Sequence, residues 1–194
     1  MKIGSNNSLT YLEPSSWWFK IFRWLVRKQE LSYDTQYSFW GIRMFDFRIC
    51  FGSKNRIMVR DGKHKFRLDS FYEILDYFDK REDVIVRITL DAPKEELTQG
   101  LETKFKQTCH LMDAIYEHIG FFGGYSLHDK KVIYKFDWEH KNGTPILICP
   151  TEWSRIYNFV CKWLPFWVRR FNQVYINRYN NNDGYLMINY VNRR

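Results

Sequence analysis

The feature that most constrains this chain is the alternation of strand-like and helix-like segments along most of its 194 residues. In residues 41–50 (GIRMFDFRIC), apolar and charged side chains alternate with the two-residue period of a β-strand. In residues 68–78, apolar side chains instead recur at the spacing of one helical face, with Asp69 or Ser70 placed as the capping residue. This alternation predicts an α/β fold with a largely parallel sheet.

The expected elements run from one end of the chain to the other. Strands are predicted at residues 2–5, 41–50, 56–60, 84–90, 131–137, 146–149, 173–177 and 185–191, and helices at residues 15–28, 68–78, 93–119 and 152–163. A closed (β/α) barrel usually needs about 200 residues or more, so a barrel of this length would be small, with helices lost or shortened on one side. The chain contains no repeat, low-complexity run or linker, which predicts a single domain over residues 1–194.

The charge balance limits the classes of partner. Thirty Lys and Arg residues stand against 22 Asp and Glu, giving a net charge of +8, and 45% of the residues are hydrophobic. This composition excludes a disordered chain and favours anionic partners such as phosphates, phospholipid surfaces or nucleic acid. No nucleic-acid-binding motif accompanies the charge, so nucleic acid is the least expected of the three.

The chain has four cysteines, Cys50, Cys109, Cys149 and Cys161. They form no C-x-x-C pair and have no metal-ligand spacing, so we expect buried thiols, no metal and no cofactor. No apolar stretch follows the N-terminus as a secretory signal requires. The most apolar stretches, near residues 17–26 and 159–168, are well short of the roughly 20 residues that a membrane-spanning helix needs. We therefore expect an intracellular protein, soluble or peripheral to a membrane.

Aromatic and basic residues gather in two segments. Aromatic residues make up 19% of the chain, and tryptophan mixed with lysine and arginine is typical of surfaces at a lipid headgroup layer. The first segment contains Trp17, Trp18, Lys20 and Arg23, and the second contains Trp163, Trp167, Arg169 and Arg170. We predict that these residues contact an anionic membrane surface or a protein partner. The alternative for the first segment is an ordinary helix whose apolar face packs on the core.

Four motifs, in the correct order, resemble those of the X-domain of the phosphatidylinositol-specific phospholipase C superfamily. Residues 4–11 (GSNNSLTY) are similar to its opening G-[ST]-H-[ND]-S motif, and residues 41–48 (GIRMFDFR) to its G-x-R-x-F-D-x-R strand. Residues 57–62 (IMVRDG) occupy the place of a segment that ends in His-Gly, and residues 184–192 (GYLMINYVN) are similar to the closing strand. The middle of the chain matches by element order only.

The resemblance implies a fold and an ancestral activity. The fold is a distorted, incompletely closed TIM barrel of the phospholipase-C-like phosphodiesterase type, and the activity is cleavage of a phosphodiester in a lipid headgroup. The family uses two histidines as acid and base, because a pKa of about 6.5 suits proton transfer near neutral pH. Bacterial members also carry a membrane-touching helix where residues 15–28 fall in this chain.

This sequence departs from the family at the positions that move protons. Asn6 stands in the place of the first histidine, and an amide cannot act as a general base. Asp61 stands in the place of the second, and a carboxylic acid with a reference pKa of about 3.9 is ionised at neutral pH. The carboxylate that follows the first histidine in bacterial members is Asn7 here, and the aspartate that orients this histidine is Asn189.

The resemblance places the phosphate-neutralising arginine of bacterial members at Arg48, with Asp46 two residues earlier on the same strand face. Metal-dependent members carry acids in place of Arg48 and Thr89, so the resemblance implies no calcium site. Structural explanations remain open for each of these positions. Arg48 and Asp46 could form an ion pair inside the barrel mouth, and Asn6, Asn7 and Asp61 could be turn residues.

The predicted function is a phosphate- or headgroup-binding pseudoenzyme of the phospholipase C type. A first alternative is an active phosphodiesterase in which His64 or His140 supplies the acid or base from another position. A second alternative is a structural component of a larger assembly that contacts its partners through the basic, aromatic C-terminal region. A metal held by Asp46, Asp91 and Asp137 is less expected than either, because these acids lack any ligand spacing.

Overall fold

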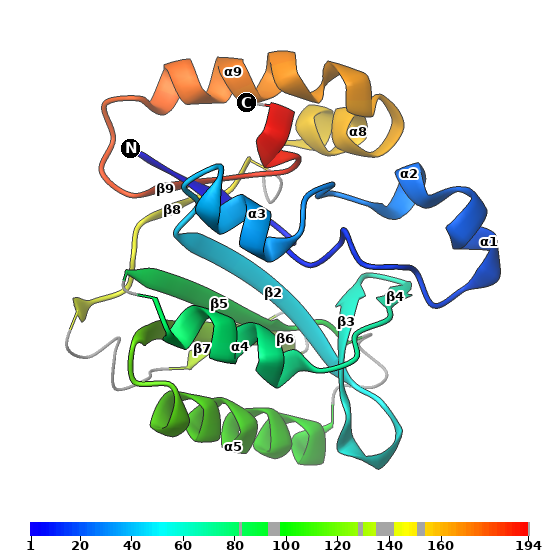
Figure 1. Cartoon of the computed structure of the whole chain (residues 1–194), viewed down its shortest axis with the longest axis vertical. Helices are drawn as coiled ribbons and strands as arrows, with labels where there is room; N and C mark the ends of the chain where they lie inside the picture. The colour runs from blue at the N-terminus through cyan, green and yellow to red at the C-terminus, as the bar shows by residue number, and fades with distance from the viewer. Residues whose placement is uncertain (82, 93–97, 128–129, 135–141, 151–153, 194) are drawn as a thin grey trace.

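Nine strands form one sheet in the computed structural model, which describes all residues except 82, 93–97, 128–129, 135–141, 151–153 and 194 (Figure 1). The strands are β1 (Lys2–Ser5), β2 (Met44–Phe51), β3 (Ile57–Asp61), β4 (His64–Phe66), β5 (Val84–Leu90), β6 (Ile119–Leu127), β7 (Lys130–Tyr134), β8 (Leu147–Ile148) and β9 (Tyr185–Ile188). They follow the order β7-β6-β5-β2-β1-β9-β8, with β3 beside β2 and β4 beside β3.

The central strands of the sheet run parallel. Strands β6, β5, β2, β1, β9 and β8 pair in parallel, whereas β3, β4 and β7 are added antiparallel. The predicted α/β class with a largely parallel sheet is therefore confirmed. Strand β1 lies between β2 and the last strand, β9, so the first and last strands of the chain are neighbours in the sheet. Among the described residues no pairing joins β7 to β8, and the sheet is open there.

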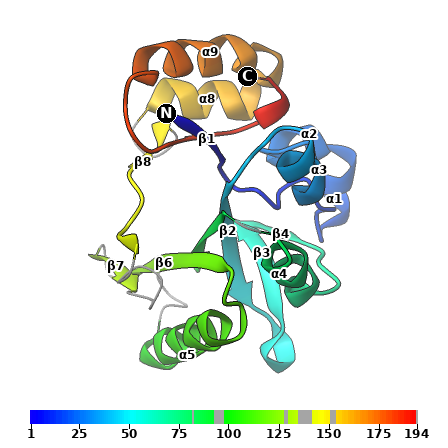
Figure 2. The same ribbon diagram turned by 60° about the vertical axis from the view of Figure 1, so that its left-hand side comes forward.

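Seven α-helices and three 3-10 helices accompany the described strands. They are α1 (Trp17–Ile21), α2 (Arg23–Val26), α3 (Tyr33–Ser38), η1 (Ser53–Asn55), α4 (Phe71–Asp79), α5 (Gln99–Ile115), α8 (Arg155–Trp163), η3 (Pro165–Trp167), α9 (Val168–Tyr179) and η4 (Val191–Arg193). Figures 1 and 2 show α8 and α9 together at one end of the molecule, near β9, and α5 at the opposite end, near β6. No helix in the described part of the chain has the length and apolar character needed to cross a bilayer.

Side-chain caps fix the start of α4, α5 and α8, the last through Ser154 Oγ, which accepts from the N–H of Tyr157 at 3.1 Å. Ser70 Oγ accepts a hydrogen bond from the third residue of α4 at 3.3 Å, as the sequence predicts. Thr98 Oγ1 accepts in the same way at the start of α5. The helix predicted over residues 93–119 ends earlier than expected, because Tyr116 leaves the helical conformation and Ile119 opens β6.

Two predicted elements are wrong. Residues 173–177 lie inside α9 and not in a strand; buried residues three and four apart mark one face of this helix, a period that five residues are too few to reveal. The helix predicted over residues 15–28 is broken at Phe22 into α1 and α2. No side chain of α1 is fully buried, and Phe19 is the α1 residue that packs against the core, so few core contacts hold a longer helix together.

Other predicted elements differ at their boundaries. The strand predicted over residues 131–137 is β7, and residues 135–137 lie outside the described part of the chain. The strand predicted over residues 185–191 ends at Ile188, after which the chain turns through Tyr190 with a positive φ of 51°. Helix α3 and strand β4 were not predicted.

Phenylalanine fills the core, and tryptophan lies outside it. One cluster of buried apolar side chains extends from Leu9 to Val191. Its fully buried aromatic residues include Tyr157, Tyr190, Phe45, Phe47, Phe66, Phe78, Phe105 and Phe121. None of the tryptophans that the structure describes is buried. The four cysteines are buried thiols outside any disulfide, as predicted, and burial raises the pKa of Cys161 to about 11.

Candidate functional site

The parallel pairing of β1 with its two neighbours brings three polar residues to one level of the sheet. Ser5, the last residue of β1, lies opposite Phe45 of β2 and Ile188 of β9. The next residue on each strand or strand end is Asn6, Asp46 or Asn189. All three are fully buried. Residues from both ends of the sequence therefore form one polar centre.

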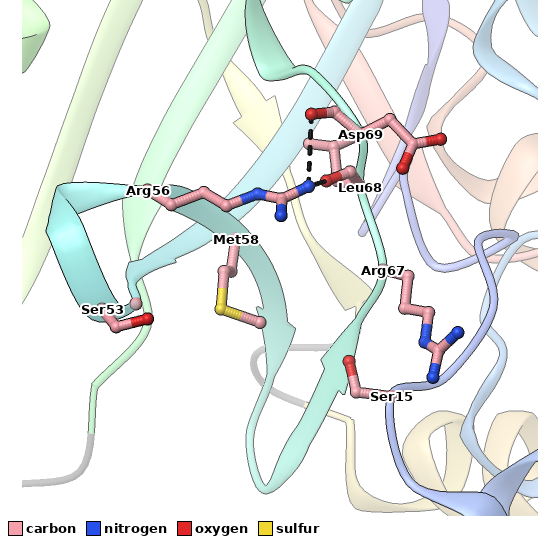
Figure 3. A pocket seen from close by; sticks show the side chains of 8 residues that line it. Ser15, Ser53, Arg56, Met58, Arg67, Leu68 and Asp69 are labelled. Carbon is pink, nitrogen blue, oxygen red and sulfur yellow. Dashed lines mark hydrogen bonds between the residues drawn. The ribbon is translucent and has the colours of Figure 1, made fainter.

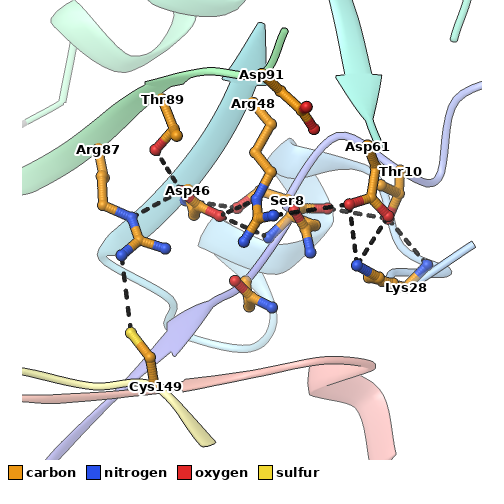
Figure 4. A network of polar contacts seen from close by, with 12 residues as sticks. Ser8, Thr10, Lys28, Asp46, Arg48, Asp61, Arg87, Thr89, Asp91 and Cys149 are labelled. Carbon is orange, nitrogen blue, oxygen red and sulfur yellow. Dashed lines mark hydrogen bonds and ion pairs between the residues drawn. The ribbon is translucent and has the colours of Figure 1, made fainter. Parts of the chain in front are cut away.

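Asp46 is the centre of a buried ionic network (Figure 4). Arg87 donates from Nε to Asp46 Oδ1 at 2.8 Å, and Arg48 donates from Nε to Oδ2 at 3.3 Å. The backbone N–H of Asn7 also donates to Oδ2, at 3.2 Å. Burial acts to raise the pKa of Asp46, but the charges of Arg87 and Arg48 outweigh it and hold this pKa well below its usual range.

Arg48 faces a second carboxylate. Its Nη1 lies 3.8 Å from Asp61 Oδ1, and Lys28 Nζ lies 2.9 Å from the same oxygen and 2.8 Å from Oδ2. The side chains of Arg48 and Lys28 are 25% and 29% exposed, so both cations reach solvent while Asp46 does not. Burial acts to lower the pKa of Arg48, but the charges of Asp46 and Asp61 raise it above its ordinary value.

A tight turn after β1 places Asn7 beside this network. Asn7 has a left-handed backbone with φ of 49°, which asparagine tolerates better than most residues. Ser8 fixes the turn to β2, because its N–H donates to the carbonyl of Asp46 and its hydroxyl accepts from the N–H of Asp46, both at 2.9 Å. The side-chain amide of Asn7 is buried and forms no hydrogen bond with any described residue.

Asn6 and Asn189 bond to each other across the sheet. Asn6 Nδ2 donates to Asn189 Oδ1 at 2.9 Å. The backbone N–H of Asn189 donates to the hydroxyl of Tyr157, which in turn donates to Asn172 Oδ1 at 2.5 Å. Gln29 Nε2 donates to the carbonyl of Asn6 at 2.9 Å. These neutral groups join the ends of β1 and β9 to helices α8 and α9.

The less expected alternative, a metal held by Asp46, Asp91 and Asp137, receives no support from the described geometry. Asp46 is surrounded by guanidinium groups, and Asp91 Oδ2 accepts from the N–H of Gly62 at 2.7 Å. Asp137 lies outside the described residues. Among the residues that are described, no three histidine, cysteine or acidic side chains form a group able to hold a metal ion. Thr89 Oγ1 donates to Asp46 at 3.5 Å instead.

The structure places one of the two candidate surrogate histidines near the network. His64 opens β4 opposite Asp61 in the β3–β4 pairing, and its ring lies edge-on to Phe19 with centroids 4.3 Å apart. Residues directly opposite each other in antiparallel strands point to the same face. His64 is therefore on the Asp61 side of this hairpin. His140 lies outside the described residues.

Two cations of the network were not predicted as site residues. Lys28 belongs to the first basic segment, and only the folded chain brings it to Asp61. Arg87 lies opposite Asp46 in the β2–β5 register. Its signal in the sequence is a charged residue in a strand whose other residues, apart from Thr89, are apolar and which lies between two parallel neighbours. Arg87 also donates from Nη1 to the Cys149 thiol at 3.7 Å, which directs it away from the Arg48 side.

The two aromatic segments lie side by side, because α2 contacts α8. Their exposed apolar side chains, which we call the aromatic surface, are Trp17, Trp18, Ile21, Phe22 and Trp24 from α1 and α2, and Ile156, Phe159, Trp163, Phe166 and Trp167 from α8 and η3. Trp17 and Trp18 are each 62% exposed. The alternative in which the first segment packs its apolar face on the core therefore holds only in part: Phe19 and Val26 pack on the core, whereas the indole rings do not.

The basic residues predicted beside these tryptophans divide into two kinds. Lys20 Nζ lies 3.5 Å from Glu13, and Arg23 donates to the carbonyl of Tyr11 at 2.8 Å, so both are engaged by the protein itself. Arg169 and Arg170 of α9 are exposed to solvent. The basic rim of the aromatic surface is thus most accessible on the α9 side.

A separate cavity of about 380 Å³ lies between the β2–β3 connection and the loop that precedes α4 (Figure 3). Its polar lining comes from Ser15, Ser53, Arg56, Arg67 and Asp69. Arg56 donates from Nη2 to the backbone carbonyls of Leu68 and Asp69. Its guanidinium is therefore engaged by the backbone, away from the Asp46 network.

No family model matches this chain, and no curated protein matches it by sequence. Its fold is similar to that of a double mutant of the phosphatidylinositol-specific phospholipase C from S. aureus, with a TM-score of 0.58 and 14% sequence identity. The match covers 97% of this chain and 84% of the other. The chain therefore has a phospholipase-C-like fold, as its four motifs predict.

Proposed function

We propose that this chain is a phospholipase-C-like pseudoenzyme, an incompletely closed barrel that binds a phosphate group through Arg48 and does not cleave it. The observation that carries the proposal is the hydrogen bond between Asn6 and Asn189. At these two positions the resemblance expects a histidine and its orienting aspartate. Two amides bonded to each other neither accept nor release a proton near neutral pH.

Cleavage of a phosphodiester needs a base for the nucleophile and an acid for the leaving oxygen. Asn6 supplies neither. Asp61, at the second position, has its carboxylate oxygens engaged by Lys28 and Arg48. The arrangement keeps the means of holding an anion and lacks the means of moving a proton.

Two features support anion binding at this site. Arg48 is charged and a quarter of its side chain is exposed, so a ligand can reach it. The buried amide of Asn7, which no described group satisfies, offers a donor and an acceptor two residues beyond β1. A phosphate ester would accept hydrogen bonds from both side chains. The shared chemistry is a phosphate group, whether free or part of a lipid headgroup.

The test measures binding and turnover on the same protein. Calorimetric titration with inorganic phosphate and with glycerophosphoinositol tests the free anion and the headgroup diester, and vesicles that contain phosphatidylinositol test the lipid. We expect binding that Arg48→Gln abolishes and Arg56→Gln leaves intact. Arg56 is the matched control because its guanidinium lines the separate cavity.

Two results would contradict this proposal. If Arg56→Gln abolishes binding and Arg48→Gln does not, the anion binds in the cavity and not at Arg48. Metal-free turnover that His64→Ala abolishes would establish the enzymatic alternative, which the position of His64 opposite Asp61 favours. Such an enzyme would also have a pH–rate profile with an inflection near the histidine range.

A second function is favoured by the aromatic surface. We propose that this surface rests on an anionic membrane, because indole rings beside arginines suit the headgroup layer. The test is cosedimentation with phosphatidylserine vesicles at low and high salt. Wild-type protein should bind in a salt-sensitive way, and Trp17→Ala with Trp18→Ala should weaken binding. If the chain does not bind vesicles and aggregates until a protein partner is added, the structural-component alternative is favoured instead.

A further inference from the structure

We propose that Asp61 is an internal occupant of the phosphate site: its carboxylate holds Arg48 and Lys28 in the absence of ligand, and an incoming phosphate takes its place on both cations. The inference rests on the proposed function and adds Lys28 as the second cation of the site. It also assigns Asp61 a role opposite to that of a proton donor.

The two cations converge on Asp61 from different parts of the chain. Arg48 comes from β2, and Lys28 follows α2. Both ion pairs involve Asp61 Oδ1, at 3.8 Å from Arg48 and 2.9 Å from Lys28. A single negatively charged oxygen therefore already occupies a position between two positive groups. A phosphate oxygen has the charge and the acceptor character for the same position.

Asp46, the other carboxylate that faces Arg48, is not a candidate for displacement by phosphate. Asp46 is completely buried and held by Arg87 at 2.8 Å, which makes it a fixed part of the interior. The Asp61 side chain is 10% exposed, and its contact with Arg48 is longer than a hydrogen bond. Of the two carboxylates that face Arg48, Asp61 is the one that a ligand can displace.

Displacement requires side chains to move, and the backbone around them is fixed. The backbone N–H groups of Lys28 and Gln29 both donate to Thr10 Oγ1 at 3.0 Å. The N–H of Tyr190 donates to the carbonyl of Lys28 at 2.7 Å. The long Lys28 side chain can therefore exchange Asp61 for a ligand oxygen without a shift of the main chain.

The charge of Asp61 makes it an obstacle to anions. A negative charge within about 4 Å of the binding cation opposes a second negative charge there, even where solvent screens the pair. Asp61→Asn removes this charge and keeps the size of the side chain. We expect this variant to bind inorganic phosphate about tenfold more tightly than wild type, in line with charge repulsion at that separation.

The matched control is Asp83→Asn. Asp83 precedes β5 and pairs with Arg43 at 3.1 Å, away from the Asp46 network. The substitution changes the net charge of the protein by the same amount, so a general electrostatic effect would appear in both variants. We expect phosphate affinity in Asp83→Asn to stay within about twofold of wild type, because exposed charges at a distance are screened.

Lys28→Gln tests the second cation. This variant should bind phosphate more weakly than wild type, and the loss should be larger in the Asp61→Asn background, where Lys28 faces the ligand without a competing carboxylate. Circular dichroism and thermal melting of each variant establish that it is folded. If Asp61→Asn does not fold, Asp61→Ser provides a second removal of the charge.

The outcomes separate this inference from the proposed function. Phosphate binding that depends on Arg48 but is unchanged or weakened by Asp61→Asn overturns the inference and leaves the proposed function standing. Binding by Asp61→Asn and not by wild type supports the internal occupant in its strongest form. If neither protein binds phosphate, both proposals fail.

Discussion

The interior network around Asp46 and the exposed aromatic surface differ in how their side chains are paired and buried. In the interior, Asp46 of β2 pairs with Arg87 of the neighbouring strand β5 and with Arg48 of its own strand. On the aromatic surface, Trp17 and Trp18 pack against each other with ring centroids 4.7 Å apart and leave most of their area in solvent. The first arrangement holds strands together, whereas the second contributes little to stability and is available to a partner.

Mutations in the two regions should therefore affect different properties of the protein. Substitutions in the network are expected to reduce stability, because they leave buried charges or polar groups without partners. Substitutions on the aromatic surface are expected to spare stability and change binding.

Asp46→Asn is expected to cause the largest loss of stability. It leaves Arg48 and Arg87 without the carboxylate that both contact, and breaking a buried ion pair in this way costs about 3–5 kcal/mol. Urea unfolding of the variant and of wild type measures the difference. Asp83→Asn, which breaks an exposed pair, should cost less than about 1 kcal/mol. Equal effects in the two variants would contradict this expectation.

Tyr157→Phe is expected to cost about 1–3 kcal/mol, because it leaves two buried polar groups unsatisfied. The lost hydroxyl bonds both the N–H of Asn189 and the side chain of Asn172. Tyr175→Phe is the matched control, since Tyr175 packs edge-on against Tyr157 and is also largely buried. A loss confined to Tyr157→Phe would show that the amide network stabilises the joined ends of the chain.

Acid is expected to weaken the interior network. The folded pKa of Asp46 lies below its unfolded value of about 3.9. Its contribution to stability is therefore present above about pH 4 and lost as the pH falls toward the folded pKa. Unfolding free energies measured from neutral pH down to about pH 3 should fall in wild type and fall less steeply in Asp46→Asn. A parallel decline in both proteins would assign the acid sensitivity to other carboxylates.

The double substitution Trp17→Ala and Trp18→Ala is expected to have the smallest effect on stability, within about 0.5 kcal/mol. The same protein should lose most of its affinity for anionic vesicles. Thermal melting and vesicle cosedimentation on one preparation measure both quantities. A large drop in stability would place these residues in the fold and not at an interface, which would remove the contrast between the two regions.

The sequence predicts the fold best where one period governs a whole element. Strand β2 and helix α4 follow from their apolar patterns, and the cap at Ser70 follows from its position. Residues 173–177 span less than two turns of α9, so their pattern alone does not reveal the helical period. The break at Phe22 could not be predicted, since it depends on what the α1 side chains find to pack against.

The site was predictable only as far as the motifs extend. Asn6, Asp46, Arg48, Asp61 and Asn189 come from the four motifs, and the structure brings them together. Lys28 and Arg87 lie outside the motifs. Their roles depend on the register of β5 and on the path of the chain after α2, which no local pattern encodes. The same holds for the Asn6–Asn189 bond, which joins residues 183 positions apart.

Phosphorus NMR of glycerophosphoinositol, recorded with wild-type protein and with Arg48→Gln, distinguishes binding without cleavage from turnover. We expect the diester resonance to shift and broaden with wild type, to stay a single uncleaved species through prolonged incubation, and to be unperturbed by Arg48→Gln. A new phosphorus resonance from a cleaved product, or an equal perturbation by both proteins, would contradict the proposed function.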